Sequence, residues 1–267
     1  MQVSKLLLKN KNGRQYEMDF YQLTEIAKLK DDQHPLMLIL PGGSFNHLSI
    51  REGEAIALAY LHYGFQAAVL KYNLIQDGPV YPDAYQSVLD AISYFRQNAT
   101  ELKIDPNRIV TIGFSAGGHV ATTANNFADD SNRPNLTILG YPLISFGKIG
   151  FEIPTEAQKL FPKEKEIYDT SLGVNEKTPA SFIFHASDDK TVDVQNSLEY
   201  ALALAEHHVP CETHIYRNGG HGFGLATPEQ VVHGREFTDN PHVSTWFKLS
   251  LEWLRLSFEK HDFSSRD

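Results

Sequence analysis

Gly113-Phe114-Ser115-Ala116-Gly117 is the stretch that decides how this chain folds, because it joins an apolar β-strand to a helix. Residues 108–112 before it are rich in β-branched side chains, and the small residues 116–121 open the helix. A serine between two glycines at such a join sits on a strained turn that lifts its Oγ above the sheet. The Ala116 N–H then lies at the helix N-terminus, where it can stabilise an oxyanion. The sequence therefore predicts Ser115 as a nucleophile.

The composition is typical of a globular α/β protein. The 267 residues are 42% hydrophobic and 21% charged, which provides enough apolar material for a substantial core. A net charge of −9 opposes binding to nucleic acid or to an anionic membrane, so we expect neither as a partner. Cys211 is the only cysteine, which excludes an internal disulfide and suits a reducing cytoplasm. The apolar run 6–8 is too short for a signal peptide, and we expect a cytoplasmic protein.

Strand and helix patterns alternate along the chain. Asn12-Gly13 between residues 5–8 and 15–21 indicates a hairpin. The crossovers further along are long enough for right-handed βαβ units, which predicts one α/β domain over residues 1–267, with a mostly parallel sheet covered by helices on both faces. Apolar runs and helical periodicity predict strands at 36–40, 65–72, 108–112, 136–139, 181–185 and 212–216, and helices at 52–63, 84–98, 116 onward, 196–207 and 243–258.

Residues 145–179 interrupt this pattern with prolines, glycines and a mixed cluster of charges. A connection of this length between two core strands is usually functional. One interpretation is a small cap-like insertion over the site, and the other is a surface excursion without a role. The sequence leaves both open.

A serine nucleophile needs a base, and the base needs a carboxylate that orients it. Ligands of such a sheet bind at the carboxyl ends of the strands, so both partners should follow later strands, with the acid before the histidine. Asp188, Asp189 and Asp193 follow the strand at 181–185, although Asp193 could instead start the next helix. His221 follows the last strand, between glycines that free the backbone to place its imidazole. The sequence therefore predicts His221 as the base and one of three aspartates as the acid.

The second donor to an oxyanion is expected in the loop after the strand at 36–40. There Pro41-Gly42-Gly43-Ser44 offers backbone N–H groups without obstructing side chains, and Gly43 or Ser44 is the expected donor. His119 is expected to pack on the helix that follows Ser115. The sequence contains no metal-binding motif and no phosphate loop, so we expect neither a metal nor a cofactor.

The chain resembles the α/β-hydrolase superfamily of serine esterases, and within it the acetylesterase and acetylxylan-esterase-like branch near the hormone-sensitive-lipase-type enzymes. In related hydrolases a histidine at a strand end precedes the catalytic aspartate by four positions, and a valine follows three positions later. His185, Asp189 and Val192 match this pattern, so the resemblance implies Asp189 as the acid. The other matching motifs are Pro41-Gly42-Gly43-Ser44-Phe45, Arg51-Glu52-Gly53-Glu54, Leu70-Lys71-Tyr72, Tyr81-Pro82-Asp83, residues 113–119, Thr178-Pro179, residues 220–224 and the helix with Trp246 and Trp253.

Two departures from the family pattern bear on the substrate. Many such esterases carry His-Gly-Gly-Gly where this chain has Pro41-Gly42-Gly43-Ser44, which implies a differently shaped oxyanion loop. The expected lack of a secretion signal argues against polymeric xylan and for acetylated oligosaccharides or another small ester.

The resemblance implies a carboxylic-ester hydrolase that removes short acyl groups, acetyl in particular, through an acyl-enzyme. The expected substrate is small, and a carbohydrate is one candidate. Phe45, Tyr72, Tyr81 and Phe223 are the expected substrate-binding side chains. A serine peptidase or amidase of the same fold is the alternative hypothesis. A non-catalytic binding protein is a third, which the presence of all three triad candidates disfavours. We expect a small-molecule ester as the partner, and a homodimer stays open.

Overall fold

A computed structural model describes residues 1–24, 33–150, 152, 158, 162–231 and 239–263 of the chain. Within these residues the centre is an eight-stranded sheet in the order β1-β2-β4-β3-β5-β6-β7-β8. The β1–β2 and β2–β4 pairs are antiparallel, and every pair from β4 to β8 is parallel. This confirms the mostly parallel α/β sheet and its N-terminal hairpin. The strands are β1 (Gln2–Lys9), β2 (Gln15–Gln22), β3 (His34–Leu40), β4 (Gln66–Lys71), β5 (Ile104–Phe114), β6 (Leu136–Gly140), β7 (Ala180–Ala186) and β8 (Cys211–Tyr216).

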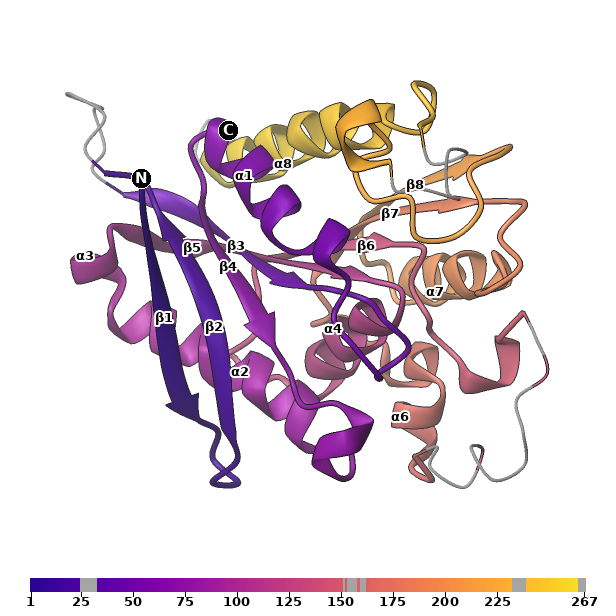
Figure 1. Cartoon of the computed structure of the whole chain (residues 1–267), viewed down its shortest axis with the longest axis horizontal. Coiled ribbons are helices and arrows are strands. Elements are labelled where there is room, and N and C mark those ends of the chain that lie inside the picture. Colours follow the sequence, from indigo (N-terminus) through magenta and orange to yellow (C-terminus); the bar gives the residue numbers. More distant parts are fainter. Residues whose placement is uncertain (25–32, 151, 153–157, 159–161, 232–238, 264–267) are drawn as a thin grey trace.

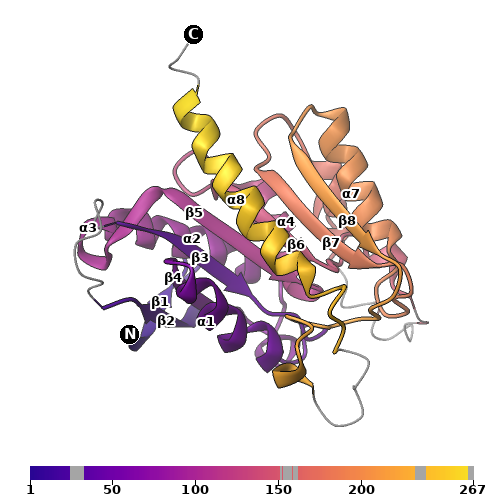
Figure 2. The same ribbon diagram turned by 90° about the horizontal axis from the view of Figure 1, so that it is seen from above.

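Helices cover both faces of the sheet (Figure 1). One face carries α1 (Glu54–His62) and α8 (Thr245–Phe263), and Figure 2 shows α8 lying across the sheet on the side of α1. The other face carries α2 (Asp83–Gln97), α4 (Ala116–Phe127) and α7 (Gln195–Glu206). Each face therefore buries its own apolar layer, as expected for a parallel sheet whose strands are apolar on both sides.

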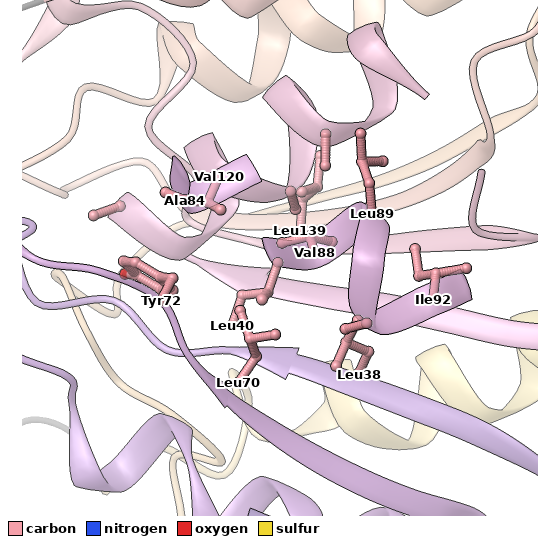
Figure 3. Close-up of a cluster of buried hydrophobic side chains, with 14 of the residues drawn as sticks. Leu38, Leu40, Leu70, Tyr72, Ala84, Val88, Leu89, Ile92, Val120 and Leu139 are labelled. Carbon is pink, nitrogen blue, oxygen red and sulfur yellow. The ribbon is translucent and has the colours of Figure 1, made fainter. Parts of the chain in front are cut away.

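The layer under α2 shows how the sequence pattern becomes packing. Leu38, Leu40 and Leu70 project from β3 and β4 toward Val88 and Ile92 of α2, and all are fully buried (Figure 3). In a strand alternate residues share one face, whereas in a helix residues four apart do so. These two periods bring apolar side chains of the strands and of the helix to the same layer.

The parallel register aligns the carboxyl ends of the central strands at one edge of the sheet. Leu40 at the end of β3 pairs with Gly113, and Phe114 at the end of β5 pairs with Gly140. At the other side of the sheet Ala186 pairs with Tyr216. The loops after β3, β5, β6, β7 and β8 therefore emerge along this edge, where ligands of such sheets bind.

The described parts of the 145–179 segment include η3 (Phe146–Lys148), α6 (Lys165–Tyr168) and η4 (Thr170–Gly173). The last of these packs on α4, where the Thr170 and Thr122 hydroxyls lie 2.9 Å apart and Asn126 Nδ2 donates to the Thr170 carbonyl (2.9 Å). Residues 151, 153–157 and 159–161 lie outside the described part of the chain. The cap-like insertion stays a prediction.

Candidate active site

Ser115 occupies the tight turn between β5 and α4. Its backbone has φ 51° and ψ −120°, a strained conformation for a residue with a side chain. Four backbone hydrogen bonds hold it there: its N–H donates to the Gly140 carbonyl (3.0 Å), and its carbonyl accepts from the N–H groups of Leu143 (3.0 Å), Gly118 (2.9 Å) and His119 (3.3 Å). The turn is thus maintained by the backbone, and Oγ remains available for chemistry.

The two flanking glycines are required by close backbone contacts. A Cβ on Gly113 would lie 2.5 Å from the Gly117 carbonyl oxygen. A Cβ on Gly117 would lie 2.0 Å from the Leu40 carbonyl oxygen. Both distances are far below van der Waals contact, so the strand and helix can approach only because neither residue has a side chain.

Ser115, His221 and Asp189 are joined by two hydrogen bonds, although the serine and the histidine are 106 positions apart. An ionised carboxylate only accepts, so His221 Nδ1–H donates to Asp189 Oδ2 (2.6 Å). The other ring nitrogen, Nε2, then accepts from the Ser115 hydroxyl (2.9 Å). The structure brings together all three residues predicted for the triad.

The Asp189 carboxylate accepts four hydrogen bonds. Oδ1 accepts from the N–H groups of Thr191 (2.8 Å) and Val192 (3.0 Å), and Oδ2 accepts from His221 and from His185 Nε2 (3.1 Å). Burial on its own raises the pKa of Asp189, but the hydrogen bonds from His185 and His221 outweigh it and lower the pKa from 3.8 to about 2. The carboxylate therefore stays ionised at any working pH.

This lowered pKa predicts a pH dependence of stability. A carboxyl group whose pKa is lower in the folded state stabilises the fold above its unfolded pKa and loses that contribution as the pH falls toward 2. The linkage for Asp189 amounts to about 2 kcal/mol at neutral pH, of which about 1 kcal/mol is lost between about pH 6 and pH 3. Urea unfolding of the wild type and of Asp189→Asn should therefore give a difference in free energy that shrinks by about 1 kcal/mol over this range. A difference in unfolding free energy that did not change with pH would contradict the lowered pKa of Asp189.

His185, whose spacing in the sequence pointed to Asp189, also hydrogen-bonds to the carboxylate of that residue. Its Nε2 faces two acceptors, Asp189 Oδ2 (3.1 Å) and the Val192 carbonyl (3.0 Å), so this nitrogen carries the hydrogen. Its Nδ1 pairs with the Ser197 hydroxyl (2.7 Å) at the start of α7. The imidazole is fully buried and links the acid loop to the helix behind it.

Asp188, the rival candidate, has a different role. Its side chain is exposed, and Oδ1 accepts from the N–H groups of Gly219 (2.9 Å) and Gly220 (2.8 Å). It thus orders the backbone just before His221 without reaching the imidazole. Asp193 lies just before α7, and its side chain accepts from the Gln195 N–H (2.9 Å), in agreement with the alternative that it helps to start this helix.

The predicted oxyanion loop lies directly against Ser115. A Cβ on Gly42 would lie 2.9 Å from Ser115 Cβ, so the loop touches the nucleophile. Gly43 has φ +131° and Ser44 has φ 55°, and a Cβ on Gly43 would lie 2.0 Å from the His47 carbonyl oxygen. This turn can therefore form only with glycine at position 43. The roles of Gly43, Ser44 and Ala116 as donors stay predictions.

Two of the four predicted substrate-binding residues are buried by packing in the structure. Phe223 is fully buried, and its ring packs against Tyr141 with centroids 4.6 Å apart. Tyr72 is 2% exposed, and its hydroxyl donates to the Pro41 carbonyl (2.6 Å), which supports the oxyanion loop from below. Both rings are thus almost fully covered, and a role for them in substrate binding stays a prediction.

Phe45 and Tyr81 belong to an aromatic cluster beside the oxyanion loop. Phe45 stacks on Phe146 with centroids 5.9 Å apart, and the His119 ring lies 4.7 Å from Phe146. The Tyr81 hydroxyl pairs with His119 Nδ1 (2.6 Å), and burial lowers the pKa of His119 to about 3, so the imidazole stays neutral. Phe146 was not among the sequence candidates, because it lies in the irregular 145–179 segment.

The described residues also bear on metal binding and on membrane insertion. Among the residues that the structure describes, no group of three or more His, Cys, Asp or Glu side chains is arranged to hold a metal ion. None of the described helices combines the length and the apolar character needed to cross a membrane.

Two family models match the chain. The model named BD-FAE matches residues 18–139, and that of the prolyl oligopeptidase family matches residues 83–239. Among solved structures, a carboxylesterase from Lactobacillus plantarum superposes with a TM-score of 0.89 at 30% identity, over 96% of this chain and 97% of that one.

Curated relatives include a xylanase and an acetylxylan esterase. The chain is 31% identical over 222 residues to endo-1,4-beta-xylanase B of Butyrivibrio fibrisolvens, and 31% identical over 205 residues to the acetylxylan esterase of Xylanibacter ruminicola. These matches cover 74% and 70% of this chain but only 34% and 41% of the relatives. The chain thus spans less than half the length of the two curated relatives.

Proposed function

The chain belongs to the α/β-hydrolase superfamily, among its serine esterases, and from this premise we propose that it is a carboxylesterase that removes short acyl groups through an acyl-enzyme. The observation that carries the proposal is the chain of hydrogen bonds from the Ser115 hydroxyl through His221 to Asp189, at 2.9 Å and 2.6 Å. The order of the three residues and the two hydrogen-bond distances are those expected where an oriented imidazole activates a serine nucleophile.

In this mechanism Ser115 Oγ attacks the ester carbonyl while His221 Nε2 takes its proton. Asp189 holds the imidazole in the tautomer that leaves Nε2 free to accept, and stabilises the cation that forms. The proton then passes to the leaving alcohol, and a water molecule, activated by the same imidazole, hydrolyses the acyl-enzyme.

The negative oxygen that forms during attack needs donors on the side of Ser115 opposite the imidazole. Ala116 N–H at the start of α4 and the N–H of Gly43 or Ser44 are the groups we assign to it. The contact between Gly42 and Ser115 supports this assignment, because it keeps the loop within reach of the nucleophile. Removal of one such donor typically lowers kcat by about 10²–10³.

We infer an acetyl ester of a small carbohydrate as the preferred substrate class. The similarity to an acetylxylan esterase supports the acetyl group. The aromatic cluster of Phe45, His119 and Phe146 supports a short acyl chain, since it is buried, lies beside the oxyanion loop and begins one helical turn after Ser115. Rings packed against one another beside this loop would restrict the length of an acyl chain that enters on their side.

The expected result is a sharp cut-off in acyl length. Across p-nitrophenyl esters from acetyl to octanoyl, kcat/KM should fall steeply beyond about four acyl carbons, whereas an open apolar pocket would gain about 0.8 kcal/mol per methylene. The same preparation should release acetate from acetylated xylo-oligosaccharides. If octanoyl were hydrolysed faster than acetyl, the protein would have a long acyl tunnel and the proposed substrate class would be wrong.

Two variants test whether the aromatic cluster limits the length of the acyl chain. Phe146→Val replaces one ring of the cluster with a smaller side chain. The variant should accept longer acyl chains and still hydrolyse acetyl esters. Phe258→Val is the matched control, because this ring lies on α8 and packs at the opposite face of the sheet. An unchanged cut-off in folded Phe146→Val would show that another element limits the acyl chain.

Amide hydrolysis is the second candidate, because the prolyl oligopeptidase family matches residues 83–239. Aminoacyl and acetyl p-nitroanilides tested beside the matching esters separate the two. We expect ester hydrolysis to be faster by several orders of magnitude, and equal rates on a peptide anilide would favour the peptidase.

A further inference from the structure

Glu52 is a buried carboxylate that the triad does not use. It ends the short helix η1 (Ile50–Glu52), and 2% of its surface is exposed. An unpaired charge at that depth would be costly, so its oxygens need hydrogen-bond donors. Oε2 accepts from the Gly42 N–H (2.8 Å), and Oε1 accepts from the Tyr141 hydroxyl (2.7 Å). One side chain therefore joins the oxyanion loop to the residue that follows β6.

Tyr141 extends this link to the loop that carries His221. Its hydroxyl accepts from the Gly224 N–H (3.1 Å), and its ring meets the His221 imidazole edge-on with centroids 5.1 Å apart. Burial, together with the negative charge of Glu52, raises the pKa of Tyr141 well above its ordinary value, so the hydroxyl stays protonated and donates. The same loop is held further by Trp246, whose Nε1 donates to the Gly224 carbonyl (2.9 Å).

Gly42 lies between Glu52 and the nucleophile. A Cβ at this position would lie 2.9 Å from both Glu52 Oε2 and Ser115 Cβ. The residues we assign as oxyanion donors follow Gly42 directly in the chain. The hydrogen bond from Gly42 to Glu52 therefore fixes the start of the oxyanion loop, and with it the N–H groups that follow, relative to Ser115.

We propose that Glu52 and Tyr141 form a positioning pair that holds the oxyanion loop and the His221 loop in register with Ser115. The proposal rests on the ester hydrolysis proposed above. Glu52 is too buried to touch a substrate, so its effect must pass through the two loops. Donors to an oxyanion act only at well-defined geometry, so loss of the bridge should weaken transition-state stabilisation more than substrate binding.

Removal of either member should lower kcat and leave KM nearly unchanged. On p-nitrophenyl acetate we expect Glu52→Gln and Tyr141→Phe each to lower kcat about 10- to 100-fold, with KM within about threefold of wild type. The double variant should be about as slow as the slower single variant, because both changes break one bridge. Glu54→Gln, which removes an exposed carboxylate two residues away, is the control and should stay within about twofold of wild type.

Inhibition by a boronic acid distinguishes a positioning role of the pair from a merely structural one, because a merely structural role would not change the inhibition constant. Ser115 Oγ adds to the boron, its proton passes to His221, and the boron becomes a tetrahedral anion that resembles the transition state. The inhibition constant should rise by the same factor as kcat falls, whereas KM should not follow. Thermal unfolding of each variant shows that it is folded at the assay temperature.

The outcomes separate this proposal from the proposed function. Wild-type kcat in folded Tyr141→Phe, or fully multiplicative losses in the double variant, would overturn the positioning pair. Tyr141→Phe removes only one hydroxyl, so it decides the question even if Glu52→Gln does not fold. If the wild type hydrolyses no ester, the proposed function fails. Labelling of Ser115 by a fluorophosphonate then still reports on the bridge, and equal labelling rates in wild type and variants would overturn it.

Discussion

Replacement of Ser115 by alanine should lower kcat for ester hydrolysis about a million-fold, the loss typical of a nucleophile that acts within a triad. The fold should remain intact, because the hydrogen bonds that hold the turn involve the backbone of Ser115 and not its hydroxyl. The alanine side chain is smaller than that of serine, so it fits into the same space against Gly42. The measurement is kcat on p-nitrophenyl acetate with purified protein, beside circular dichroism and thermal unfolding.

Residual contamination sets the sensitivity of this test, so a fluorophosphonate probe provides its control. The probe should label the wild type at Ser115 and leave the variant unlabelled. A purified variant that kept more than a few per cent of the wild-type rate would show that another group is the nucleophile.

Asp189→Asn should lower kcat by about four orders of magnitude, because it changes the tautomer of the base His221. Oδ1 of Asp189 accepts from two backbone N–H groups, so the asparagine oxygen should take that place and its NH₂ should face His221 and His185. The amide would then donate to His221 Nδ1, which puts the ring hydrogen on Nε2. That nitrogen could no longer accept the proton of Ser115.

Asp188→Asn is the matched control for this variant, one position away. Its Oδ1 accepts from Gly219 and Gly220, and an asparagine oxygen can accept the same two bonds. We expect a loss of less than about tenfold, since only the charge changes and the loop before His221 keeps its anchor. Equal losses in both variants, or a larger one in Asp188→Asn, would reverse the assignment within the pair.

Local sequence was sufficient to predict the turn at Ser115 and the positions of the strands. Glycines at 113 and 117 act on their immediate neighbours, and apolar runs mark strands buried on both faces. His221 could be predicted because the topology of such a sheet requires the base after a later strand, and glycines surround that histidine. These inferences depend on spacing along the chain, which is visible without coordinates.

The acid was harder to predict, because Asp188 and Asp189 are adjacent and chemically alike. Spacing alone left both open, and only the resemblance through His185 and Val192 favoured Asp189. In the structure the two carboxylates bond to different groups: Asp189 to two imidazoles and Asp188 to the backbone of the loop before His221. Which neighbour faces the base depends on the turn after β7, and that geometry is not encoded by residue type.

The aromatic residues show the same limit. Phe45, Tyr72, Tyr81 and Phe223 were selected because they lie near the expected mouth of the site, yet Tyr72 and Phe223 are buried in packing. Phe146, which the sequence did not single out, stacks on Phe45. Burial of a ring is decided by what packs over it, so position in the sequence is a weak guide to exposure.

The sequence by itself determined the class of fold, the nucleophile turn and the order of the predicted catalytic residues, because glycine sterics and hydrophobic period act over a few neighbouring residues. Only the tertiary structure decided that Glu52 is a buried link to Tyr141, 89 positions away, and that Asp188 anchors a loop. A surface carboxylate and a buried one look identical in a sequence. Their difference comes from desolvation and from donors contributed by distant segments, which exist only after the sheet has brought its strand ends together.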